Sequence, residues 1–240
     1  MKTKKIIAFM FISMAIFTSC DKETIRVTGE VTRTEVNITE YTGLRVSDAF
    51  NVNVTFSDNE ESIIIEANED IQDRIEVKKD GEDLNIRLKR HTSIRGNATL
   101  NVYITTGNIS SFNISGASNI TLDNTLSAEN LSLQLSGASG FTGELIVDNL
   151  ELDASGASDL DIYGTAGLFN ARLAGASNLN DYDLIVSELD VELSGASNSY
   201  LSVTEKIDIR ASGASTLNYK GDAIVATKDL SGSSEINKMN

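Results

Sequence analysis

The sequence lacks several residue types on which stability and chemistry often depend. Its 240 residues include no proline, no tryptophan, one cysteine and one histidine. Because Cys20 is the only cysteine, an internal disulfide and a cysteine-based metal site are both excluded. Stability must therefore come from packing alone. His91 lies outside the repeats described below, and we expect it in an exposed loop.

Positive charge is also scarce. The chain has 20 Lys and Arg against 35 Asp and Glu, a net charge of −15, and loss of three lysines with a signal peptide would make it −18. Such a chain repels nucleic acid and anionic membranes, so we expect no nucleic-acid partner. The acidity at most suggests calcium, but an EF-hand loop and the nonapeptide repeat of calcium-binding β-rolls are absent. We expect a solvated acidic surface without metal or cofactor.

The N-terminus is typical of a targeting segment. Its first five residues include three lysines, and the apolar run over 6–17 is too short to span a bilayer. The run ends in Phe-Thr-Ser-Cys, which resembles the lipobox of bacterial lipoproteins. We predict a signal peptide over 1–19, lipid attachment at Cys20 and a tether over 20–27, anchoring the chain to either leaflet of the outer membrane. An ordinary signal peptide with an incidental cysteine is the alternative.

The remaining chain contains an internal repeat. Ser-Gly-Ala-Ser, or a one-residue variant of it, recurs with separations of 21, 19, 19, 20, 18 and 19 residues, too regular for chance. The repeat glycines are Gly116, Gly137, Gly156, Gly175, Gly195, Gly213 and Gly232. Residues 108–240 therefore form one repetitive unit, and nothing between the glycines is long enough for a helix.

Within each repeat, apolar residues stand two, four and six positions before the glycine, as in Leu131, Leu133 and Leu135. Period two predicts a strand with one buried face. A second strand begins four positions after the glycine, and a third apolar segment appears in some repeats, as at 145–147. The serine two positions after each glycine could stack as a hydroxyl ladder between coils.

The repeat predicts an all-β fold, a right-handed parallel β-helix with one coil per repeat and equivalent residues stacked about 4.8 Å apart. The spacing of 18 to 21 residues departs from the strict count of left-handed β-helices, and the features of leucine-rich repeats are missing. In the last five repeats, the residues three positions before the glycine alternate in charge, which predicts a salt-bridge ladder. Eleven coils would give a rod about 50 Å long.

Residues 28–107 lack the glycine repeat but contain alternating apolar runs. Asp80-Gly81 between two runs is a strong hairpin signal. We expect a β-rich lead-in with some antiparallel pairing, which caps the N-terminal end of the solenoid core. The sequence leaves open whether the last coil, near Ile236, pairs with another copy.

Several of these features together resemble one known family. They are the lipoprotein signal, Arg-Val and Val-Asn-Val segments at 45–46 and 52–54, a Lys-Asp-Gly-x-x-Leu turn at 79–84 and the Leu-x-Leu-Ser-Gly-Ala-Ser coils. The chain is similar to the "putative auto-transporter adhesin, head GIN domain" family over nearly all of its mature length. The resemblance implies a right-handed β-helix on an exported lipoprotein of Gram-negative bacteria. It supplies no catalytic or binding residues.

Catalysis by paired carboxylates is a distant alternative. The pairs Glu151/Asp153, Asp159/Asp161 and Asp190/Glu192 could serve a carbohydrate-active enzyme. Each pair, however, occupies outward positions of a strand, where polar residues are required anyway, and single coils without long loops provide no walled cleft. A calcium site on Glu151, Asp190 and Asp208, which share one column, is likewise weaker than a solvated acidic face. We therefore expect that the protein is not an enzyme.

A flat face for a glycan or protein partner is a better candidate for function. Amide and phenol groups occupy outward positions after the glycines, and Tyr163 and Tyr182 stand at equivalent positions of neighbouring repeats. The candidate residues are Tyr163, Tyr182, Tyr200, Asn178, Asn180, Asn198 and Asn218. The same groups also suit structural stacking ladders. The sequence thus predicts an envelope lipoprotein with an adhesive or interaction role, with a purely structural envelope protein as the alternative.

Overall fold

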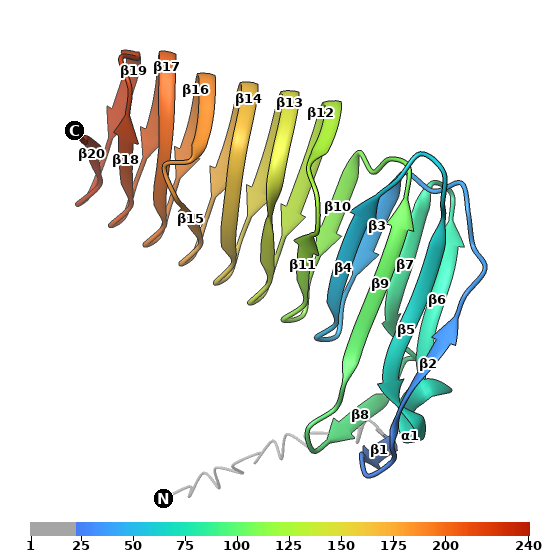
Figure 1. Ribbon diagram of the computed structural model, residues 1–240. Helices are drawn as coiled ribbons and strands as arrows, with labels where there is room; N and C mark the ends of the chain where they lie inside the picture. Colours follow the sequence, from blue (N-terminus) through green and yellow to red (C-terminus); the bar gives the residue numbers. More distant parts are fainter. Residues whose placement is uncertain (1–22) are drawn as a thin grey trace, which may run out of the picture.

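The computed structural model describes residues 23–240, so the predicted signal peptide and Cys20 lie outside the described residues. It shows a row of stacked coils that ends, at its N-terminal side, in a differently built sheet (Figure 1). The coils are formed by β10 (Ser111–Ile114), β11 (Asn119–Leu122), β12 (Leu126–Leu135), β13 (Gly140–Ala154), β14 (Asp159–Leu173), β15 (Asn178–Asn180), β16 (Leu184–Leu193), β17 (Asn198–Ala211), β18 (Thr216–Lys220), β19 (Ile224–Leu230) and β20 (Glu235–Lys238).

All strand pairs among these coils are parallel, and they follow the repeat register except for shifts where β17 pairs with β16 and with β19. Leu133, for example, pairs with Leu152, and Leu152 pairs with Ala171 in the next coil. The inward residues of successive coils stack into one continuous buried core. The predicted β-solenoid is confirmed. It has about seven turns rather than eleven, about 34 Å at the usual strand spacing, because residues 57–110 fold back into a cap instead of adding coils.

The glycine turns explain why the repeat is invariant at that position. Gly175 has a φ of +78°, and an added Cβ would lie 2.4 Å from the carbonyl oxygen of Gly156. The coils approach so closely because the N–H of Ala176 donates to that same oxygen at 2.7 Å. Only glycine fits a left-handed conformation under a neighbouring backbone.

The buried serine of each turn does not form the expected ladder between coils. The hydroxyl of Ser177 donates to the carbonyl of Ala174, three residues earlier in its own turn, at 2.9 Å. The same bond recurs at Ser139, Ser158, Ser197, Ser215 and Ser234. In these six turns the hydroxyl closes its own turn and satisfies a carbonyl there, while backbone bonds join the coils. Ser118 instead accepts a hydrogen bond from the Phe50 N–H of the first coil, and Ser234 also donates to Ala211 in the preceding coil.

The first coil is out of chain order. It consists of β3 (Gly43–Val46) and β4 (Asn51–Phe56), which pair with β10 and β11 at an offset of 68 residues, as Ser111 with Gly43. In between, the chain forms β5 (Ser62–Asn68), α1 (Glu69–Gln72), β6 (Ile75–Asp80), β7 (Asp83–Leu88), β8 (Thr92–Arg95) and β9 (Leu100–Thr106). β7 and β9 lie on the other side of β3 and β4, so the first coil is enclosed on both sides.

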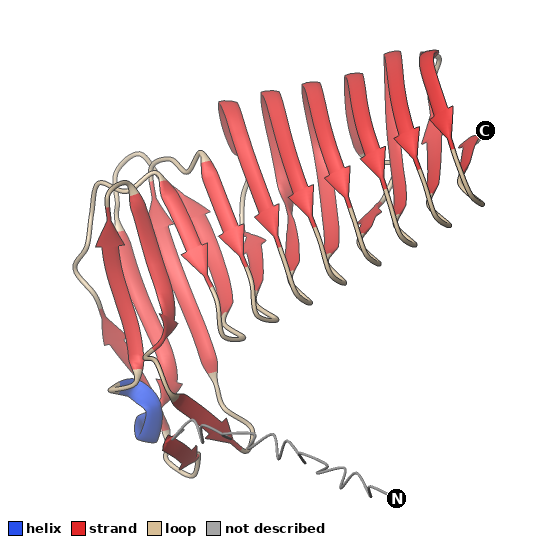
Figure 2. Ribbon diagram, turned by 180° about the vertical axis from the view of Figure 1, so that it is seen from behind, coloured by secondary structure: helices blue, strands red, loops and turns tan. Residues whose placement is uncertain are grey.

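Antiparallel strands then close the N-terminal end of the core. β2 (Val31–Glu35) pairs with β5, β5 with β9, and β6 with β7 through the Asp80-Gly81 hairpin. The expected antiparallel pairing and hairpin are confirmed. α1, at the far end of this sheet in Figure 2, buries Ile71 against the core. β1 (Glu23–Arg26), which lies within the expected tether over 20–27, pairs with β8.

The C-terminal coil ends the stack differently. β19 pairs with β17 through a register shift, and Lys228 occupies the position opposite Ile209, which is buried. Lys238 of β20 likewise stands opposite the buried Tyr219. Inward charges and irregular register discourage the addition of another strand, and lysine stems can cover apolar surface while the ammonium groups reach water. This end is therefore built against pairing with a further coil.

Candidate functional site

Each coil presents three outward faces. The strand before the glycine carries the charged face, and the strand after it carries the face we call the amide face. The segment between them, residues 145–147 in β13 and 184–186 in β16, carries the third face. All three are exteriors of flat parallel sheet, so a ligand would meet side chains in columns spaced by the coils.

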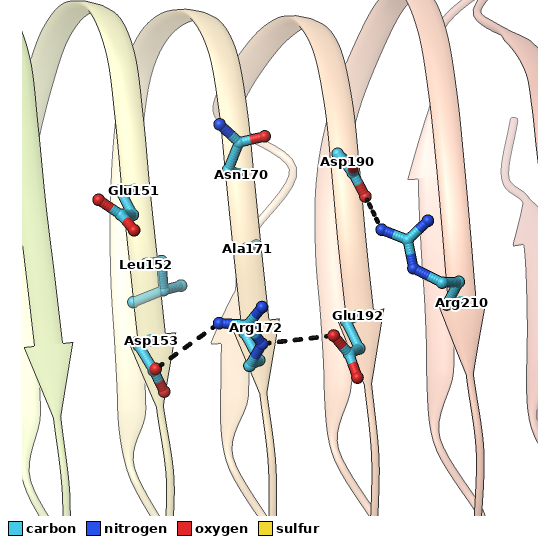
Figure 3. A pocket seen from close by; sticks show the side chains of 9 residues that line it. All are labelled: Glu151, Leu152, Asp153, Asn170, Ala171, Arg172, Asp190, Glu192 and Arg210. Atoms are coloured by element: carbon cyan, nitrogen blue, oxygen red, sulfur yellow. Dashed lines mark hydrogen bonds and ion pairs between the residues drawn. The ribbon is translucent and has the colours of Figure 1, made fainter.

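On the charged face, the column three residues before each glycine is in register as predicted. Figure 3 shows Arg172 reaching both neighbouring coils, 3.9 Å from Asp153 and 3.3 Å from Glu192. Arg210 instead pairs with Asp190 in the adjacent column, at 2.9 Å. The column is thus a partial ladder, and because its members are exposed each pair stabilises by at most about 1 kcal/mol.

These side chains line an open recess of about 210 Å³ that also includes Glu151 and Asn170 (Figure 3). Two of the three carboxylate pairs considered for catalysis are here, and three of those four carboxylates form ion pairs with arginines. The floor is flat sheet. Asn170 separates Glu151 from Asp190 in their column. In the described chain, no group of three or more His, Cys, Asp or Glu residues is placed to hold a metal ion.

The amide face runs the length of the molecule, from the cap to the last coil. Its two columns lie three and five residues after the glycines and continue into β4 and β9. The first column contains Asn101, Asn51, Asn119, Gly140, Asp159, Asn178, Asn198, Thr216 and Glu235. Nearly every position is an amide, hydroxyl or carboxylate, so the face offers regular hydrogen-bonding groups.

Several of the predicted amides bond to one another. The side-chain N–H of Asn198 donates to Asn178 at 3.2 Å, and Asn178 donates to Asp159 at 3.0 Å. Asn237 donates to Asn218 at 3.2 Å. These bonds tie neighbouring coils together, as expected for the structural interpretation of the amides. Ligand contacts on this face would therefore come from amide atoms that the ladders leave available and from the tyrosines.

Two of the predicted tyrosines lie in contact. The rings of Tyr182 and Tyr200 meet edge to face with centroids 5.7 Å apart. The ammonium of Lys220, which the sequence did not single out, lies 4.6 Å from the Tyr182 ring centroid. Lys220 pairs with Ser202, whose small side chain lets the lysine reach across a coil. Burial raises the pKa of Tyr182. The three side chains form an aromatic and cationic cluster beside the amide face.

Tyr163 does not belong to this cluster. Asp161 pairs with Asn180, but Gly164 pairs with Leu184. The coil that contains Tyr182 therefore has one more residue between its two paired positions than the coil that contains Tyr163. Tyr163 therefore lies beside Asp183, and the expectation that Tyr163 and Tyr182 are equivalent is wrong. The extra residue, where Asp181 has a φ of +91°, displaces Tyr182 from the strand. Tyr163 instead belongs to the third face.

A polar network lies where the amide face meets the cap. Glu66 accepts hydrogen bonds from Asn101 at 3.0 Å and from Tyr103 at 3.1 Å, and Arg33 pairs with it at 2.8 Å. Arg33 also lies 5.5 Å from the Tyr103 ring centroid. The hydrogen bond from Asn101, followed by those from Arg33 and Tyr103, lowers the pKa of Glu66. The network joins β2, β5 and β9.

The geometry thus defines a class: a capped β-solenoid that exposes long, flat, mostly polar faces. The chain belongs to the family described as "putative auto-transporter adhesin, head GIN domain", whose model matches residues 40–223. The predicted family is confirmed. The adhesin description suggests a cell-surface or envelope protein. In residues 23–240, no helix is long and apolar enough to cross a membrane.

Solved structures show the same fold. A protein described as a putative adhesin from Bacteroides fragilis is 20% identical, with a TM-score of 0.82 over 90% of this chain and 100% of its own. A putative adhesin from Parabacteroides merdae is 16% identical, with a TM-score of 0.73 over 90% and 99%. A protein from Parabacteroides distasonis described as a putative lipid binding protein is 16% identical, with a TM-score of 0.74 over 91% and 100%. No curated protein matches the chain.

Proposed function

We propose that this protein is a non-catalytic envelope lipoprotein, anchored through Cys20, whose solenoid serves adhesion or another interaction. The adhesin description of the family and of two structural relatives supports this role. The anchor would attach at the capped end of the solenoid, because β1 lies in the cap. The first coil and the cap would then lie nearest the membrane, and the repeat coils would extend away from it.

Within this role, the amide face is the contact surface for a glycan. The observation that carries the proposal is the contact between Tyr182 and Tyr200, which brings two phenols from different coils together beside two columns of polar groups. Tyrosine presents an apolar ring and a polar hydroxyl, which suits the mixed surface of a sugar. Asn218 of the next coil pairs with Tyr200, and the exposed Asn180 of the preceding coil can supply hydrogen bonds.

The test is binding of the purified full-length lipoprotein, in detergent, to a glycan array. The double variant Tyr182→Ala/Tyr200→Ala should weaken binding to any recognised glycan about tenfold, the equivalent of about 1.4 kcal/mol. Tyr163→Ala is the matched control, since it removes an exposed tyrosine from a different face, and it should leave binding intact. Equal losses in both variants, or no loss in either, would contradict the assignment. Release of product from a polysaccharide would contradict the non-catalytic role.

The amide ladders favour a second candidate, a purely structural envelope protein. Asn178 and Asn198 already bond to neighbours, which stabilises the stack without a ligand. Protease treatment of intact and lysed cells distinguishes the two functions. Digestion on intact cells supports a surface adhesin, whereas protection until lysis supports a periplasmic structural role. The anchor is tested separately, because Cys20→Ala should move the protein from the membrane fraction to the soluble fraction.

A further inference from the structure

The third face carries a group of apolar side chains that the core does not require. Ile146 is 51% exposed, Ile185 is 47% exposed and Tyr163 is 39% exposed. Ile146 pairs with Thr165 and Thr165 with Ile185, so one column crosses three successive coils, with Tyr163 two residues before Thr165. Leu168, 38% exposed, lies three residues after Thr165 in the same strand, β14. We call Ile146, Tyr163, Leu168 and Ile185 the apolar patch.

Packing of the core formed by residues 23–240 does not account for this clustering. The neighbours of Ile146 along the strand, Leu145 and Val147, point inward and fill the core, so the outward position is free to be polar. Exposed apolar residues that stand singly are normal, but contiguous groups mark interaction surfaces. Among residues 23–240, the other large apolar side chains with comparable exposure are Val31 in the cap, and Ile224 and Met239 near the C-terminal end.

Carboxylates surround the apolar patch. Glu144 and Asp183 flank Tyr163 on either side, Asp148 follows Ile146 by two residues, and Glu188 pairs with Leu168. None of these four acids takes part in an ion pair within the described residues. Lys206 stands opposite Glu188 in the next coil, so the patch has an apolar centre and a mostly negative rim.

The negative charge of the rim indicates which kind of partner the patch can bind. A second copy of this chain would bring four more carboxylates against the first four, and like charges across an interface oppose association. An anionic bilayer is repelled for the same reason. A surface with apolar side chains inside a basic border would complement both the apolar centre and the carboxylates of the rim. We propose that the apolar patch docks a partner protein that presents apolar residues bordered by lysine or arginine.

The apolar patch resembles the centre of a protein interface in composition. A stable interface usually covers about 800 Å² on each partner, with a few central residues carrying most of the energy. Four apolar side chains supply such a centre, and the carboxylates supply a rim that accelerates encounter and loses strength with salt. This surface is separate from the amide face, so it neither requires nor excludes glycan binding there.

The probe is a random-peptide display library panned against the full-length lipoprotein. We expect the enriched peptides to combine apolar residues with Lys or Arg and to bind more weakly at higher ionic strength. Ile146→Ser/Ile185→Ser should reduce their affinity at least tenfold. Ile224→Ser, which removes an even more exposed isoleucine from the last coil, is the matched control and should reduce it less than twofold. Unchanged thermal unfolding would show that the double variant folds.

Three outcomes would overturn the proposal. The first is that no peptides are enriched, and the second is that the enriched peptides bind the double variant as well as the parent. The third is that the parent, but not the double variant, self-associates in sedimentation or binds zwitterionic vesicles, since the patch would then contact a second copy or a lipid surface.

Discussion

Replacing Gly175 by alanine tests whether backbone stacking between coils dictates the repeat. The change has two costs. An alanine in the left-handed region costs about 1–2 kcal/mol relative to an extended or helical one, partly offset because alanine restricts the unfolded chain by about 0.4–1 kcal/mol. The second cost is steric, because the added Cβ would lie 2.4 Å from the Gly156 oxygen, where ordinary contact begins near 3.4 Å.

The neighbouring coil must therefore recede by about 1 Å, which lengthens the 2.7 Å bond from Ala176 to Gly156 beyond useful range. Leaving such groups unsatisfied costs about 1–3 kcal/mol. The total is about 2–4 kcal/mol. Gly81→Ala is the matched control, because Gly81 also has a positive φ, +63°, but a Cβ there would meet nothing within 4 Å. The control should lose only about 1 kcal/mol.

Urea unfolding followed by circular dichroism measures the difference. With a slope of about 1–3 kcal/mol per molar urea, an extra 2 kcal/mol lowers the midpoint by about 1 M relative to the control. If Gly175→Ala and Gly81→Ala shift the midpoint equally, the close approach of the coils is not what requires glycine, and the stacking argument fails.

Three further predictions concern charged groups. Folding lowers the pKa of Glu66 from its ordinary value of 4.5, so the ionised Glu66 side chain stabilises the folded state above pH 4.5, and this stabilisation is lost as the pH falls through the lowered pKa. Glu66→Gln should therefore destabilise the protein at neutral pH. The melting temperature of the variant should also fall less steeply than that of the parent between pH 5 and 3. Lys228→Val should cause concentration-dependent self-association in sedimentation velocity. The control Thr227→Val, on the outward side of the same strand, should not. A monomeric Lys228→Val would refute the argument that this lysine prevents the last coil from pairing with another strand. Arg172→Ala removes two exposed ion pairs and should cost no more than about 2 kcal/mol in urea unfolding, less in high salt; a larger loss would mean that the exposed ladder carries unexpected stability.

The solenoid itself could be predicted because its determinants are local and repeated. A glycine at a fixed interval and inward residues at period two specify each coil, and seven copies of the same information leave little freedom in the register. The charge column followed from that register, and the hairpin at Asp80-Gly81 from turn chemistry alone.

Contacts that depend on a single extra residue or on distant pairing could not be predicted. The extra residue near Asp181 separates Tyr163 from Tyr182 although both stand at the same distance from their glycines. Lys220 contacts the ring of Tyr182 only because the stacking of the coils brings them together. Arg210 forms its ion pair with Asp190 rather than with another nearby carboxylate. Such choices are decided by side-chain geometry between coils, which spacing along the chain does not encode.

The sequence by itself determined the repeat, the buried and outward positions and the requirement for glycine, because each follows from backbone geometry within one coil. The tertiary structure alone decided how the ends are closed and which outward residues meet. The chain leaves the first coil after Phe56 and returns at Ser111, and neither the enclosure of that coil nor the apolar patch around Tyr163 follows from local periodicity. Both depend on pairing between segments far apart in the chain, where packing and backbone hydrogen bonding across the whole stack select the partner.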